Sequence, residues 1–247
     1  MSAHSAAAPA AALAFRSASR SDPGRRPRNE DRVLERPDLG LWAVADGMGG
    51  HRDGGDAAGR LLAALAAPSD APLHGYVRLA ELERRAAGVN AELYGEGAGA
   101  GGLSGTTLVA LLIHERHAAV VWAGDSRAYL MRGGTLTRVS RDHSRVQELV
   151  ESGALAERRR DAHPDAHVVT RAVGAARRLE LERRFVGVEP GDRFLLCSDG
   201  LTGCLDDHAI AARLAAADPD EATAALLSAA LAAGAADNVS LALVACI

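Results

Sequence analysis

Three apolar segments of this sequence each end in an aspartate. LWAVADG carries Asp46, VVWAGDS carries Asp125 and FLLCSDG carries Asp199. A single aspartate in this position is commonly only a turn residue, because Asp and Gly both favour turns. Carboxylates are also the ligands that a hard divalent cation prefers. Taken singly, each aspartate can therefore be interpreted either as a turn residue or as a metal ligand.

Two further acidic clusters lie beside predicted strands. Residues 29–31 (NED) precede one strand, and Asp237 with Asn238 precedes the mainly apolar residues 239–244. Carboxylates gathered at one end of a core repel one another, and their pKa values rise unless a cation neutralises them. Because no Cys or His cluster accompanies them, magnesium or manganese fits better than zinc. Gly47 has no side chain, which lets its carbonyl approach an ion.

Short apolar strands would position these acidic groups. They are predicted at residues 41–45, 107–113, 118–123, 128–132, 193–197 and 239–245. Most of them are apolar on both faces, so we expect sheets covered by helices rather than by water. Residues 114–117 would be the turn of an antiparallel hairpin. The glycine-rich stretch 95–102 is expected to be a loop.

A helix over residues 77–94 has the clearest periodicity. Its apolar residues recur at steps of three and four, at Leu79, Leu82, Ala86, Val89 and Leu93. This spacing places them on one face of a helix. Other helices are predicted over 57–66, 144–151, 207–217 and 221–233. Asp142 or Ser144 would cap one of them, and Asp218 followed by Pro219 would begin another.

Length and composition limit the class of protein. A chain of 247 residues, 48% of them hydrophobic, can bury one substantial core, so we expect a flexible N-terminus over residues 1–10 and one domain over 11–247. The formal charge is −4, which leaves no basic excess for nucleic acid. No apolar stretch approaches the ~18 residues of a membrane span. We therefore expect no membrane association and a cytoplasmic location.

Eight short blocks resemble, in order, those of the metal-dependent protein phosphatase 2C family in its compact bacterial form. They are Arg26 with NED (29–31), ADGMGGH (45–51), SGTT (104–107), AGDSR (123–127), RDHS (141–144), TRAVG (170–174), CSDGL (197–201) and ADNVS (236–240). The resemblance implies an α+β fold, a four-layer αββα sandwich of two antiparallel sheets flanked by helices. It also implies a serine/threonine phosphoprotein phosphatase that hydrolyses phosphomonoesters with a metal-bridging hydroxide.

The family resemblance further implies two Mn²⁺ or Mg²⁺ ions and assigns their ligands. Asp46 would bridge both ions, Asp199 and Asp237 would bind one, and the carbonyl of Gly47 would bind the other. Asn238 would orient its neighbour.

Three more acidic residues follow from the same resemblance. Glu30 and Asp31 would hold the second ion mainly through water molecules. Asp125, together with Asp199, would hold a third and weaker ion beside the substrate.

Arg26 matches the phosphate-binding arginine of the family, and a planar guanidinium suits bidentate contact with phosphate oxygens. The alternative is a solvated charge in an arginine-rich run that includes Arg25 and Arg28. His51 would donate a proton to the leaving serine or threonine oxygen, or else be a surface or structural histidine. His143 is expected to be structural.

Other kinds of catalytic site fit the sequence less well than a metal-dependent phosphatase site. Ser104, Thr106 and Thr107 form no catalytic triad pattern and are expected to open a buried strand. A cysteine phosphatase needs an arginine six residues after its nucleophilic cysteine. Six residues after Cys197 the sequence has Gly203, and six residues after Cys204 it has Ile210, so this class is excluded. By the same family resemblance, residues 170–174 would close a flap that begins after Ser144 and lies near the substrate; alternatively they are an ordinary connection.

The resemblance also suggests partners, namely phosphorylated Ser/Thr proteins and a bacterial Ser/Thr kinase, with the chain acting as a monomer. Two alternatives remain from other classes. One is a phosphoprotein-binding regulator without turnover. Such a protein would have no reason to keep acidic residues that repel one another. The other is a structural cation site, which would not need Arg26.

Overall fold

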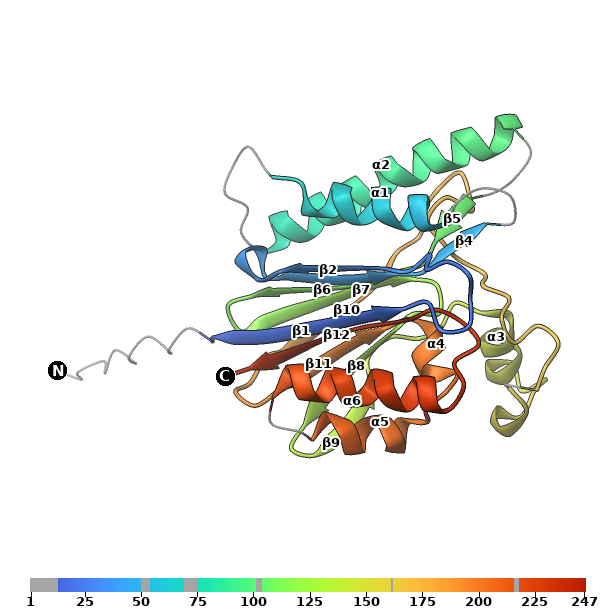
Figure 1. Ribbon diagram of the computed structural model, residues 1–247. Helices are drawn as coiled ribbons and strands as arrows, with labels where there is room; N and C mark the ends of the chain where they lie inside the picture. Colours follow the sequence, from blue (N-terminus) through green and yellow to red (C-terminus); the bar gives the residue numbers. More distant parts are fainter. Residues whose placement is uncertain (1–12, 50–53, 69–74, 101–103, 161, 216–217) are drawn as a thin grey trace.

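The computed structural model describes residues 13–49, 54–68, 75–100, 104–160, 162–215 and 218–247. Residues 1–10, expected to be flexible, and His51 lie outside these ranges. The described chain forms four layers (Figure 1), in which α1 and α2 cover one antiparallel sheet and α4, α5 and α6 cover the other. The predicted α+β sandwich is confirmed.

Two five-stranded sheets form the centre of the sandwich. One has the order β1 (Phe15–Asp22), β12 (Val239–Cys246), β11 (Arg193–Cys197), β8 (Arg127–Arg132) and β9 (Thr135–Arg138). The other has the order β10 (Glu182–Gly187), β7 (His117–Ala123), β6 (Leu108–His114), β3 (Leu41–Ala45) and β2 (Arg32–Arg36). A separate pair is formed by β4 (Gly47–Gly49) and β5 (Ser104–Thr106). The predicted hairpin is β6 with β7.

The helices fall close to their predicted positions. They are α1 (Gly54–Ala66), α2 (Tyr76–Ala100), α3 (Arg145–Glu151), α4 (Asp199–Thr202), α5 (Asp207–Leu214) and α6 (Pro219–Ala232), with short 3-10 turns η1 (Pro37–Leu39) and η2 (Glu157–Arg159). Ser144, and not Asp142, caps α3. Asp218 caps α6 ahead of Pro219, as predicted. In the described residues no helix combines the length and the apolarity that a membrane crossing requires.

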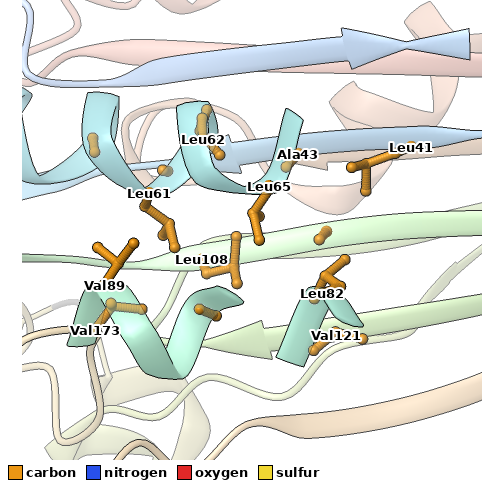
Figure 2. Close-up of a cluster of buried hydrophobic side chains, with 14 of the residues drawn as sticks. Leu41, Ala43, Leu61, Leu62, Leu65, Leu82, Val89, Leu108, Val121 and Val173 are labelled. Atoms are coloured by element: carbon orange, nitrogen blue, oxygen red, sulfur yellow. The ribbon is translucent and has the colours of Figure 1, made fainter. Parts of the chain in front are cut away.

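Alternation along β3 explains why its residues are all apolar. Successive side chains of a strand point to opposite faces. Leu41 and Ala43 therefore pack beneath the helices, whereas Trp42 and Val44 pack between the two sheets. Figure 2 shows the outer of these two cores, where α1 contributes Leu61, Leu62 and Leu65 and α2 contributes Leu82 and Val89. Both faces of the strand are covered, as its composition predicts.

One sequence prediction is corrected, and one edge strand was not predicted. Of the predicted loop at 95–102, residues 95–100 are the last turns of α2, and residues 101–102 lie outside the described ranges. Arg60 of α1 donates hydrogen bonds to Glu92 (2.9 Å) and Glu96 (3.1 Å), and these contacts support the helix across its glycines. The edge strand β10 was not predicted, because its sequence ERRFVG is largely exposed and polar. Its main-chain pairing with β7 defines it instead.

Candidate metal centre

The pairing of β2 with β3 brings two of the predicted ligands together. Arg32, the first residue of β2, pairs with Ala45, the last residue of β3. Asp31 and Asp46 are the next residues beyond this pair, so they leave the sheet at the same end. Neither strand pattern alone contains this information, because the register of the pairing creates the proximity.

The other sheet contributes three carboxylates at the same end. Cys197, the last residue of β11, pairs with Arg127, the first residue of β8. Asp199 follows β11 and opens α4, Asp125 lies just before β8, and Asp237 lies just before β12. In Figure 1 this is the end of the sandwich where β4, β5 and α4 lie.

The backbone of Asp46 is held by the SGTT segment. Its carbonyl accepts hydrogen bonds from Thr107 N (2.8 Å) and Thr106 Oγ1 (2.9 Å), and its own N–H donates to Thr107 Oγ1 (3.0 Å). Thr107 Oγ1 also lies 2.7 Å from Ser126 Oγ. These hydroxyls are buried and engaged, so they position Asp46 and are not nucleophiles. This agrees with the expectation that the segment opens a buried strand.

Asp31 is buried in a network of serines. Ser198 Oγ donates to Asp31 Oδ2 at 2.8 Å and accepts a hydrogen bond from Ser240 N at 2.9 Å. The other oxygen, Asp31 Oδ1, is buried and has no hydrogen-bond partner in the described part of the chain. Buried carboxylate oxygens are normally satisfied. An oxygen left in this state fits a ligand position for a cation.

Burial and mutual repulsion raise the pKa values of the clustered carboxylates. Burial raises the pKa of Asp31 to about 6, although the side chains of Ser198 and Ser240 act in the opposite direction and lower it. Burial, followed by repulsion from Asp199, raises the pKa of Asp125 to about 8. Burial also raises the pKa of Asp46 well above its ordinary value, and Asp31 and Asp199 add to this by repulsion.

The carboxylates converge without closing a complete ligand shell. Repulsion from Asp237 contributes to the raised pKa of Asp199, Asp46 and Asp31. Five carboxylates from five strand ends therefore share one electrostatic site. Within the described ranges, however, no three acidic or histidine side chains already form a group arranged to hold an ion.

Gly47 and Glu30 occupy a tight backbone junction. A Cβ built on Gly47 would lie 2.2 Å from Gly54 O and 2.7 Å from Glu30 O, so no larger residue fits there. A Cβ built on Gly54 would lie 2.8 Å from Glu30 Oε2. The Glu30 side chain therefore lies against the first turn of α1, beside Gly47. This proximity is required if Glu30 and the Gly47 carbonyl are to hold the same ion.

Arg26 lies at the exposed margin of the acidic cluster. Its Nη2 donates to Asp237 Oδ2 at 2.8 Å, and 57% of its side chain is exposed. Asn238 holds the same loop, because its Oδ1 accepts a hydrogen bond from Glu30 N and its Nδ2 donates to Arg28 O. Its N–H also donates to Asp237 Oδ1 at 2.9 Å. Asn238 thus orients both the loop and its neighbour.

Two histidines differ in their relation to the site. His143 is buried, accepts a hydrogen bond from Gly124 N at 3.2 Å and lies 2.9 Å from Glu182 Oε2, which agrees with its expected structural role. His167 is exposed, and its Nδ1 lies 4.0 Å from Asp199 Oδ2. Sequence reasoning missed His167, since no pattern marked it. His51 lies outside the described residues, so both of its interpretations stay predictions.

Comparison with known proteins decides the family. The family model described as protein phosphatase 2C matches residues 32–160. The chain belongs to the protein phosphatase 2C family. The serine/threonine protein phosphatase PstP of Mycobacterium tuberculosis is 36% identical over 231 residues, covering 92% of this chain. The match covers 44% of the length of that phosphatase 2C relative.

Two solved structures share the fold over nearly the whole chain. PppA, a key regulatory component of T6SS in Pseudomonas aeruginosa, is 40% identical, with a TM-score of 0.87 over 96% of this chain and 99% of that one. The catalytic domain of PstP in complex with two manganese ions is 34% identical, with a TM-score of 0.83 over 95% and 99%.

The raised pKa values predict that the metal-free protein loses stability as pH rises. A carboxyl whose pKa is raised by folding binds more protons in the folded than in the unfolded state above about pH 4, so the free energy of unfolding falls with pH. Between pH 6 and 8.5 the folded state loses the proton of Asp125, and the melting temperature in EDTA should fall by on the order of 5 °C.

Differential scanning fluorimetry of the wild type and of Asp125→Asn would measure this effect. The variant mimics the neutral carboxyl and should show a smaller decline with pH. The same slope in both proteins would contradict the assignment.

Proposed function

We propose that this chain is a serine/threonine phosphoprotein phosphatase that hydrolyses phosphomonoesters at a centre of two Mn²⁺ or Mg²⁺ ions. The observation that carries the proposal is the convergence of carboxylates from both sheets, among them a buried Asp31 oxygen without a hydrogen-bond partner in the described chain. Clustered, repelling carboxylates with oxygen donors fit hard divalent cations. The two manganese ions bound to the related PstP catalytic domain support the same choice of metal.

The acidic residues would hold these ions. When bound, such ions neutralise the carboxylates and lower the pKa of water towards neutrality. We assign the bridging position to Asp46, with the remaining ligands at Asp199, Asp237, the Gly47 carbonyl, Glu30, Asp31 and, for a third and weaker ion, Asp125. The hydrogen bonds of Thr106 and Thr107 to the Asp46 backbone would keep its carboxylate aimed into the site.

Arg26 would bind the phosphate group of the substrate. Its guanidinium is exposed and is held over Asp237 by one nitrogen, which leaves further N–H donors for phosphate oxygens. Donors placed where charge develops stabilise the transition state. The threonines of the SGTT segment are engaged with the backbone, so the arrangement favours direct attack by water without a covalent enzyme intermediate.

Removal of divalent ions is expected to abolish turnover. Hydrolysis of a phosphothreonine peptide should fall to the background rate in EDTA and return when Mn²⁺ or Mg²⁺ is added in excess, because the carboxylates alone supply no electrophile. Release of inorganic phosphate measures both states. Full activity of chelated protein would sink the proposal. Calcium, which is larger and accepts looser coordination, is a matched ion for comparison.

The biological partners follow from the same proposal. We propose that the chain acts in the cytoplasm, as a monomer, on phosphorylated proteins that include a bacterial Ser/Thr kinase and its substrates. Its likeness to PppA, which regulates T6SS in Pseudomonas aeruginosa, supports a regulatory setting of this kind. Dephosphorylation of a purified, autophosphorylated kinase, compared with the Asp46→Asn variant, tests the partner. Light scattering tests the monomer.

A further inference from the structure

A buried aspartate outside the proposed ligand set receives three arginines. The carboxylate of Asp142 is only 2% exposed. Arg127 of β8 contacts it with Nε–Oδ1 at 3.1 Å and Nη2–Oδ2 at 2.9 Å, and Arg138 of β9 contacts Oδ1. Arg160 contacts Oδ2 from a different part of the chain, beyond α3. Arg127 and Arg138 already compensate the negative charge of Asp142. Arg160 is therefore not needed to neutralise it.

Arg160 is buried although the turn that precedes it is exposed. The residue is 8% exposed, and its Nη1 also donates to Gln147 Oε1 on α3 at 2.8 Å. Arg158 and Arg159, its neighbours in η2, are exposed. A guanidinium is costly to bury unless it is paired. No residue of η2 is buried, so the local core does not explain why Arg160 points inwards.

The described chain after Arg160 approaches one member of the acidic cluster, Asp199. It is fixed again where Thr170 N donates to His143 O at 2.8 Å and where Val173 bridges to Thr106. Residues 162–169, which lie between Arg160 and Thr170, are called the tethered segment. Its far end is also held by the hydrogen bond from Arg145 N to Val168 O (2.8 Å) and by the bridge between Ser144 and Val169. It carries His167, whose Nδ1 lies 4.0 Å from Asp199 Oδ2. Arg160 is therefore the first anchor of a segment that reaches the proposed centre.

We infer that Arg160 is a positioning residue for phosphoprotein substrates, through its ion pair with Asp142. This inference rests on the proposed phosphatase function. The pair holds the tethered segment beside the metal centre, where it forms a wall that the polypeptide flanking a phosphoserine or phosphothreonine contacts. A small aryl phosphate is too short to need this wall. Arg160 thus contributes to binding of the protein part of the substrate and not to the chemistry of the phosphate.

The Arg160→Gln variant tests this role, with Arg159→Gln as the matched control of equal charge change. In Arg160→Gln, the KM for a phosphothreonine peptide should rise about tenfold while kcat and KM for p-nitrophenyl phosphate stay within about twofold. Arg160→Lys keeps the charge without the planar fork, so its KM for the peptide should lie between those of wild type and Arg160→Gln. Arg159→Gln should behave as wild type.

Amide hydrogen exchange measures the positioning without relying on activity. In metal-free protein, Arg160→Gln should speed exchange over residues 162–170 and leave the strands unchanged, because local opening reflects the loss of a local anchor. Unaltered exchange, or an equal loss of rate on both substrates, would overturn the inference. If the wild type hydrolysed neither substrate, the proposed function would fall, and the exchange comparison would still decide whether Arg160 anchors the segment.

Discussion

Replacing Asp46 with Asn is expected to lower kcat for a phosphothreonine peptide by at least ~10³-fold while the protein stays folded. Asp46 is the carboxylate on which the repulsion of the others converges, since Asp31, Asp199, Asp125 and Asp237 all contribute to its raised pKa. Loss of its charge would remove the one ligand assigned to both ions. The backbone of the residue would keep its three hydrogen bonds with Thr106 and Thr107, because none involves the carboxylate.

A second measurement separates loss of the site from loss of the fold. In EDTA at pH 8, Asp46→Asn should melt at a higher temperature than the wild type, because it removes an ionisable carboxyl from a buried cluster of repelling carboxylates. Asp220→Asn is the matched control. Asp220 is exposed and pairs with Arg20 on the surface, so turnover and melting should both stay near wild type. If Asp46→Asn turned over substrate at the wild-type rate, the proposed metal centre would be contradicted.

Local sequence patterns predicted sheets covered by helices, whereas the four-layer arrangement was implied by the family resemblance. The alternation of Trp42 and Val44 with Leu41 and Ala43 shows that both faces of β3 are buried, which requires a covered sheet. The cap at Asp218 and the stripe along α2 are likewise local. Elements without such a trace were missed, and β10 is the clearest case. Its exposed, polar sequence gains its structure from pairing with β7.

The sequence predicted that the acidic residues gather at one end of the core. It did not predict the hydrogen bonds and ion pairs that support them. Asp31 and Asp46 stand out by sequence position at strand ends. The bond from Ser198 to Asp31 joins residues 167 positions apart, and the contact of Arg160 with Asp142 joins a buried pair that no short motif contains. Such contacts depend on the strand register and the path of the loops. Physical reasoning from spacing alone has no access to them.

Replacing Arg26 with Ala is expected to lower kcat/KM for the phosphopeptide by about 10²-fold, whereas Arg28→Ala in the same run should have little effect. Arg26 is the arginine whose guanidinium reaches Asp237, and it stays exposed enough to meet a substrate. Loss of its donors removes contacts to phosphate oxygens. The inhibition constant of inorganic phosphate should rise in parallel, because the product carries the same oxygens.

The contact between Arg26 and Asp237 allows a second explanation, in which Arg26 only orients a metal ligand. A titration with Mn²⁺ distinguishes the two. If Arg26 acts through Asp237, excess Mn²⁺ restores the activity of Arg26→Ala, since weak metal binding is overcome by mass action. If it binds phosphate, saturating Mn²⁺ leaves the defect in place. A structural cation site would make Arg26→Ala indistinguishable from wild type, and a phosphoprotein-binding regulator would show turnover in no variant.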